Sequence, residues 1–94
     1  MSDVRTVSAI IRGRVQGVSY RAWTKDKAAG LGLSGYVRNL PDGSVEALFS
    51  GPTETVEQML VLCRKGPLLA RVDDIAVTEG AETPARPGFT VERG

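Results

Sequence analysis

The fold is constrained most by the pattern of apolar residues along this chain of 94 residues. Two spacings of these residues occur, in a definite order. Two segments carry apolar residues at helical spacing, and the others carry them at every second position, as strands with one buried face do. The expected elements are strands at 6–12, 34–39, 44–50 and 71–78, a short last strand at 89–92, and helices at 19–29 and from 53 to 65. This β-α-β-β-α-β order predicts an α+β, ferredoxin-like sandwich, in which both helices cover one face of an antiparallel sheet.

The connections carry residues that fit this order. Residues 40–43 (LPDG) are typical of a tight turn, which makes strands 34–39 and 44–50 a hairpin. Gly30 or Gly32 is expected to end the first helix in a left-handed conformation. The sequence also predicts Thr53 as the cap of the second helix and Gly66 with Pro67 as its end.

The glycine-containing loop between the first strand and the first helix suggests a binding site. Residues 13–21 read GRVQGVSYR. Two glycines let the backbone turn tightly, and the helix start adds unpaired N–H donors and the positive end of a dipole. Such a loop suits a small anion, above all phosphate, and Arg21 in the first helical turn can grip it with two parallel bonds. The alternative is a plain strand-to-helix connection with an exposed arginine.

Composition excludes several classes of chemistry. The chain has no histidine, which removes the usual general acid–base, histidine-dependent triads and most catalytic zinc sites. One cysteine cannot form an internal disulfide, so a cytoplasmic location is expected, and the N-terminus lacks the pattern of a secretion signal. A net charge of +1 and no apolar run of membrane length argue against nucleic acid and membrane partners. A length of 94 residues predicts a single domain, 1–94.

Three other motifs give weaker indications of function than the glycine-containing loop does. Residues 30–35 match GxGxxG by letter, but this dinucleotide motif needs a strand before it and a helix after it, and here the order is reversed. Asp73 and Asp74 are adjacent on a strand and point to opposite faces, so they are interpreted as solvated charges and no metal site is expected. Cys63 lies on the apolar stripe of the second helix, which indicates a packing residue.

The same element order also occurs in RNA-recognition modules. These modules stack bases on aromatic residues of the central strands, within an aromatic-rich run. The middle strands of this chain have one aromatic residue each, Tyr36 and Phe49, and no such run. Asn39 ends the second strand; it either bonds the backbone of the following turn or holds a water molecule through its amide.

Residues 13–21 (GRVQGVSYR), with 35–39 (GYVRN) and 42–46 (DGSVE), resemble the acylphosphatase family. The likeness runs over nearly the whole chain, to the terminal FTV at 89–91. It implies the ferredoxin-like arrangement and hydrolysis of the carboxyl–phosphate bond of acyl phosphates, with no metal and no organic cofactor. One departure is visible: Tyr20 stands where many members carry phenylalanine, and its hydroxyl needs a partner.

The resemblance also assigns roles. It implies that Arg21 binds the phosphate and that Asn39 orients the attacking water. It further implies a phosphate site made by the backbone N–H groups of the loop together with the arginine: Val15, Gln16, Gly17, Val18, Ser19, Tyr20 and Arg21.

Elementary chemistry agrees with this activity. An acyl phosphate leaves as a carboxylate whose conjugate acid has a pKa of about 4, so it needs no general acid. The expected partner is a small-molecule acyl phosphate, and the expected state is a monomer. Two alternatives remain: a non-catalytic phosphate- or acyl-phosphate-binding module, as found attached to larger carbamoyl-transfer proteins, and an RNA-binding module.

Overall fold

A computed structural model describes residues 3–93 and shows two helices packed on a five-stranded sheet. The expected elements are all present, each within two residues of its expected start and end. In chain order they are β1 (Val4–Arg14), α1 (Tyr20–Gly30), β2 (Ser34–Asn39), β3 (Val45–Pro52), α2 (Thr53–Lys65), β4 (Arg71–Glu79) and β5 (Phe89–Glu92).

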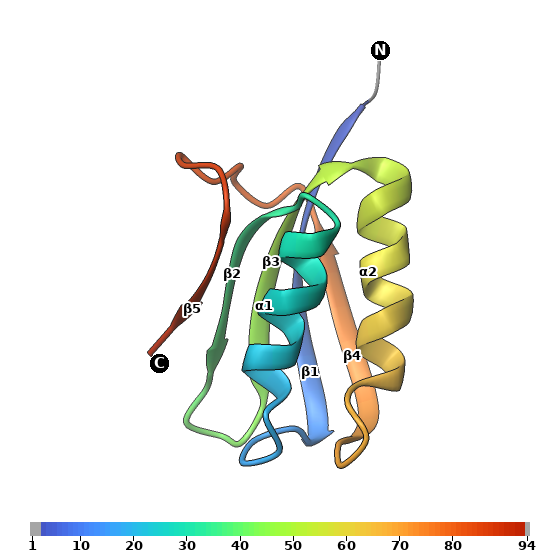
Figure 1. Ribbon diagram of the computed structural model, residues 1–94, viewed down its shortest axis with the longest axis vertical. Helices are drawn as coiled ribbons and strands as arrows, with labels where there is room; N and C mark the ends of the chain where they lie inside the picture. The colour runs from blue at the N-terminus through green and yellow to red at the C-terminus, as the bar shows by residue number, and fades with distance from the viewer. Residues whose placement is uncertain (1–2, 94) are drawn as a thin grey trace.

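The sheet has the strand order β4-β1-β3-β2-β5. The first four strands in this order are antiparallel to their neighbours, as the ferredoxin-like fold requires. β5 instead pairs parallel with β2, with Gly35 opposite Phe89, so the expectation of an entirely antiparallel sheet is wrong for this strand. The connection from β4 is long enough to return β5 to the far edge, where it runs in the same direction as β2 (Figure 1).

Both helices cover the same face of the sheet (Figure 1). Alternation along β1 and β3 buries Val7, Ala9 and Ile11 opposite Phe49, Ala47 and Val45. The apolar stripe of α2 closes this core with Val56, Met59, Leu60 and Cys63. Removing this apolar surface from water is the main force that holds the helices on the sheet.

One helix start differs from expectation. Thr53 is the first residue of α2, and Pro52 occupies the cap position with no side-chain cap bond. Pro52 has extended backbone angles and no N–H, so the chain enters the helix through proline geometry rather than a threonine cap. The Thr53 hydroxyl reaches back to the carbonyl of Asp3 instead, at 3.4 Å.

Three connections meet at one end of the molecule: the β1–α1 loop, the β2–β3 turn and the α2–β4 loop (Figure 1). The turn has the expected chemistry, because the Gly43 N–H donates to the Leu40 carbonyl at 3.2 Å and Gly43 has φ +93°. Within residues 3–93, no helix has both the length and the apolar character needed to cross a bilayer.

Candidate active site

A cavity of about 340 Å³ lies where the β1–α1 loop meets the end of β2. The loop, the start of α1, the last residue of β2 and a residue of β5 form its wall: Val15, Gln16, Gly17, Ser19, Tyr20, Arg21, Ala22, Asn39 and Val91. Arg21 is the one charged residue among them. The structure therefore brings Arg21 and Asn39 to the same small space.

The loop backbone leaves several N–H donors free. The first bond of α1 runs from the Trp23 N–H to the Ser19 carbonyl at 3.0 Å, so the N–H groups of residues 20–22 have no partner within the helix. In the described part of the chain, the N–H groups of residues 15–19 also donate to no protein acceptor. Such unpaired donors at a helix N-terminus attract an anion.

Backbone conformation explains how the donors are turned into the loop. Gly17 has φ +74°, and Ser19 has φ +64° and ψ +23°, both left-handed. Ser19 occupies the cap position without making a side-chain cap bond. A left-handed residue other than glycine costs about 1 kcal/mol or more, and such strain gathers at functional sites.

Gly13 places the loop against β4. Its φ is +134°, and a Cβ added there would lie 2.1 Å from the Arg71 carbonyl oxygen. The pairing of β1 with β4 shifts at this point, between Arg12 and Gly13. Only glycine permits this close approach, from which the chain turns away into the loop.

Arg21 is the second residue of α1 and is half-buried. Four other arginines of the described region each pair with a carboxylate, as Arg38 does with Glu46 at 2.7 Å, and Arg21 makes no such pair within residues 3–93. Its guanidinium therefore keeps its five donors for a ligand. This arrangement suits a bidentate grip on a phosphoryl group.

Asn39 ends β2 opposite Val45 of β3. Its Oδ1 is buried and has no hydrogen-bond partner among residues 3–93. Buried polar atoms almost always have a partner, so an orphaned acceptor on a cavity wall indicates a ligand or water. The amide can accept a hydrogen bond from a water molecule and donate one to a phosphoryl oxygen.

The structure separates the predicted loop residues into two groups. Most of them line the cavity, but Val18 does not; its side chain packs into the core, to which Val15 and Tyr20 also belong. Ala22 and Val91 line the cavity without having been anticipated. Val91 comes from β5, and its approach follows from the parallel pairing with β2, which periodicity does not reveal.

A smaller hollow of about 280 Å³ adjoins the cavity and shares Arg21 and Asn39 with it. Its other walls are Leu40, Pro41 and Arg93. Arg93 comes from the segment after β5, so it too is a residue that sequence reasoning missed. No local pattern near the C-terminus signals this contact.

The hydroxyl of Tyr20 finds the partner that its burial requires. It donates to the Cys63 carbonyl at 2.8 Å. In a continuing helix, the Cys63 carbonyl would accept a bond from the N–H of residue 67. That residue is Pro67, which has no N–H, so the Tyr20 hydroxyl is the donor instead. Burial raises the pKa of the Tyr20 hydroxyl, and burial also raises the pKa of the Cys63 thiol to about 12, which fits a packing role.

We expect Tyr20→Phe to lower the free energy of unfolding by about 1 to 2 kcal/mol, because the buried Cys63 carbonyl loses its donor. Urea unfolding followed by far-UV circular dichroism measures the difference. Tyr36→Phe is the matched control, since the Tyr36 hydroxyl makes only a long contact of 3.4 Å with Glu46. Equal stability losses in the two variants would contradict the role of the Tyr20 bond.

The other motifs have structural roles. Gly30 is the last residue of α1 and Gly32 has φ +75°, so residues 30–35 join a helix to a strand. Asp73 pairs with Arg71 and Asp74 with Arg12. Within residues 3–93, no three residues of the types that bind metals come together.

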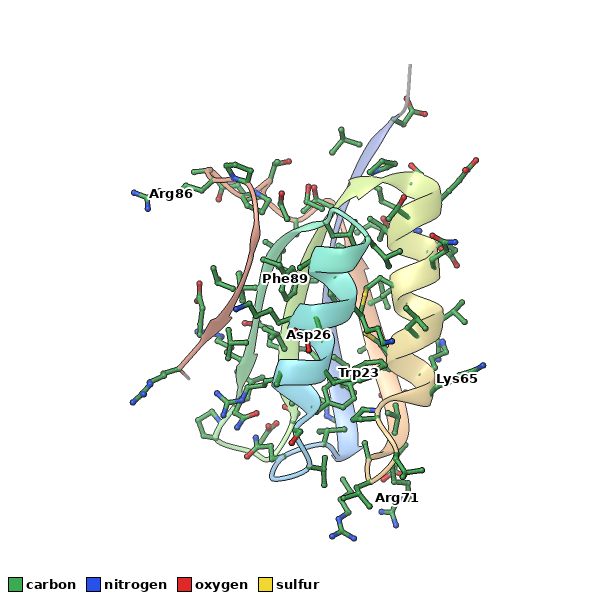
Figure 2. The ribbon with its side chains drawn as sticks, in the orientation of Figure 1. Trp23, Asp26, Lys65, Arg71, Arg86 and Phe89 are labelled. Atoms are coloured by element: carbon green, nitrogen blue, oxygen red, sulfur yellow. The ribbon has the colours of Figure 1, made fainter. Side chains whose placement is uncertain are left out.

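The aromatic residues do not form a base-stacking platform. Phe49 is fully buried and stacks on Phe89, with ring centroids 5.6 Å apart. Tyr36 lies on the opposite side of the sheet, beside Arg38 and Glu46. The Trp23 ring lies between the two helices, with its centroid 5.5 Å from that of Tyr20 (Figure 2). These positions disfavour the RNA-binding alternative.

The sequence of this chain matches a known protein family. The family model described as acylphosphatase matches residues 7–91. The acylphosphatase of Rhodospirillum rubrum is 56% identical over 87 residues, which cover 93% of this chain and 94% of that protein.

Comparison with solved structures agrees. The acylphosphatase from Bacillus subtilis superposes with a TM-score of 0.89 and 32% identity, covering 94% of this chain and 98% of that one. T. kodakarensis HypF also matches, with a TM-score of 0.81 and 30% identity. There the match covers 94% of this chain but 12% of the other, so HypF contains a similar domain within a much longer protein.

Proposed function

Since this chain belongs to the acylphosphatase family and is an enzyme that hydrolyses acyl phosphates to a carboxylate and inorganic phosphate, we propose that Arg21, Asn39 and the loop amides carry out the reaction without a metal or cofactor. The observation that supports this assignment most is the shared cavity. It combines unpaired N–H donors, one guanidinium and the orphaned oxygen of Asn39.

The loop and Arg21 bind the phosphoryl group. Its peripheral oxygens accept hydrogen bonds from the N–H groups of residues 15–20, while the guanidinium neutralises charge. Phosphoryl transfer passes through a loose transition state in which charge is spread over these oxygens. Donors that are already aimed at them stabilise that state with little reorganisation.

The leaving group needs no help from an acid. The acyl oxygen departs as a carboxylate, whose conjugate acid has a pKa of about 4. A phosphate monoester would instead release an alkoxide, which requires a proton. A site built from Arg21, Asn39 and backbone amides therefore favours acyl phosphates over monoesters.

Asn39 directs the attacking water. Its Oδ1 accepts a hydrogen bond from the water and turns a lone pair toward phosphorus, in line with the departing acyl oxygen. The water's proton passes to an oxygen of the substrate's own phosphate. The new P–O bond forms as the acyl O–P bond breaks, and the products are a carboxylate and inorganic phosphate.

We also propose that residues 1–94 form one domain that acts as a monomer in the cytoplasm, on small acyl phosphates rather than nucleic acid. The near-neutral charge and the single, buried cysteine support this setting. The non-catalytic phosphate-binding module that the sequence alone left open is disfavoured. The R. rubrum and B. subtilis acylphosphatases, each matched over more than nine-tenths of its length, favour the enzyme.

Hydrolysis of benzoyl phosphate in the presence of excess EDTA tests metal independence. We expect the same kcat and KM with and without the chelator, because a guanidinium and amides supply the positive potential that a metal would otherwise provide. Loss of activity in EDTA that returns with added Mg²⁺ or Zn²⁺ would contradict the proposal. Phosphate binding without turnover would favour the non-catalytic module.

A further inference from the structure

The Gln16 side chain spans the gap between the β1–α1 loop and the β2–β3 turn. Its Nε2 donates to the Leu40 carbonyl at 2.9 Å and to the Ser44 carbonyl at 2.9 Å. These two carbonyls stand at the two ends of the turn, where the Leu40 N–H also donates to the Ser44 carbonyl at 2.9 Å. One amide group thus uses both of its N–H bonds on the segment that follows Asn39.

The strand order of the sheet provides no direct link between the β1–α1 loop and the end of β2. β3 lies between β1 and β2, so no backbone ladder joins the strand that leads into the phosphate loop to the strand that ends at Asn39. The turn beyond Asn39 is exposed at Pro41, Asp42 and Gly43. The bonds of Gln16 tie the loop directly to the residue next to Asn39, which would otherwise be placed only through β3.

We propose that Gln16 is a positioning residue that holds the Asn39 amide at a fixed distance from the phosphate loop. This inference rests on the proposed role of Asn39 in orienting water. Gln16 holds the Leu40 carbonyl, and it also holds the Ser44 carbonyl that accepts the Leu40 N–H. Both bonds restrain the backbone of the residue directly after Asn39, and so the direction in which the Asn39 side chain leaves the backbone. The Gln16 side chain contributes through Asn39, whereas its backbone N–H belongs to the anion-binding loop.

Gln16→Met tests the proposal, because methionine keeps the length and volume of the side chain and removes both donors. We expect kcat for benzoyl phosphate to fall by about 10-fold, since a small displacement of the water has a large effect on an in-line reaction. KM and the inhibition constant of inorganic phosphate should change by less than about 2-fold, because the loop amides and Arg21 remain. Gln58→Met, on the exposed face of α2, is the control and should keep the parental kcat.

A double-mutant cycle separates positioning from general support of the fold. In an Asn39→Ala background, Gln16→Met should lower kcat no further, because the group that it positions is gone. Two results would overturn the inference while leaving the role of Asn39 intact. One is an equal fall in kcat in both backgrounds, and the other is a rise in the phosphate inhibition constant that accounts for the loss of activity. A parental kcat in Asn39→Ala alone would instead refute the proposed role of Asn39.

A second variant guards against misfolding of the first. Gln16→Asn keeps the amide but is one methylene shorter, so it cannot reach both carbonyls. We expect it to fold, as judged by its circular dichroism, and to show the same selective fall in kcat. Parental kcat in a folded Gln16→Asn would overturn the inference.

Discussion

Arg21→Gln is expected to lower kcat/KM for benzoyl phosphate by at least ~100-fold. Arg21 is the one charged residue among the described residues that line the cavity, and no carboxylate within residues 3–93 competes for it. Glutamine keeps a polar side chain but is shorter and has neither the charge nor the two-pronged donor of a guanidinium. Both the bound phosphoryl group and the transition state lose stabilisation, so KM rises and kcat falls.

Steady-state kinetics and inhibition by inorganic phosphate measure this loss. Phosphate should inhibit the variant far more weakly than the parent, since the same guanidinium binds the product. Arg86→Gln is the matched control, because Arg86 lies in the β4–β5 loop, at the opposite end of the molecule from the cavity (Figure 2). Arg21→Lys should recover little activity, because an ammonium group does not offer a planar pair of donors. A kcat/KM within ~3-fold of the parent in Arg21→Gln would contradict the assignment.

Asn39→Ala is expected to lower kcat by about 100-fold and to leave phosphate binding nearly unchanged. The amide that orients water is gone, while the loop donors and Arg21 still bind the phosphoryl group. Because Asn39 Oδ1 has no partner in the part of the chain that the structure describes, alanine breaks no hydrogen bond there at that atom. The unfolding transition should therefore shift little.

A comparison of kcat with the phosphate inhibition constant checks this separation. Arg38→Gln is a suitable control, because Arg38 precedes Asn39 on β2, pairs with Glu46 and lies outside the cavity wall. Asn39→Asp should be as slow as Asn39→Ala, since a carboxylate beside the phosphate repels it. If Asn39→Ala bound phosphate as weakly as Arg21→Gln and kept its kcat, Asn39 would be a binding residue and the water-orienting role would be wrong.

Local patterns were sufficient to predict the secondary structure and the glycine-containing loop between β1 and α1. The stripe from Val56 to Cys63 predicts α2, and the chemistry of residues 40–43 predicts the hairpin, because each depends on neighbours in the sequence. Thr53 shows the limit of this reasoning. A threonine before a helix is a common cap, but Pro52 sets the backbone direction first.

The order of the elements, the tight glycine-containing turn in the loop and the place of Arg21 at the start of α1 were all predictable from sequence alone. Spacing and glycine content act over a few residues, so they can be read without knowing the fold. Three features become visible only in the folded chain: Asn39 faces this loop, Gln16 bonds to carbonyls 24 and 28 residues away, and parallel β5 brings Val91 to the cavity. These contacts follow from strand order and packing, because the residues that meet are distant in the chain and no local preference encodes their approach.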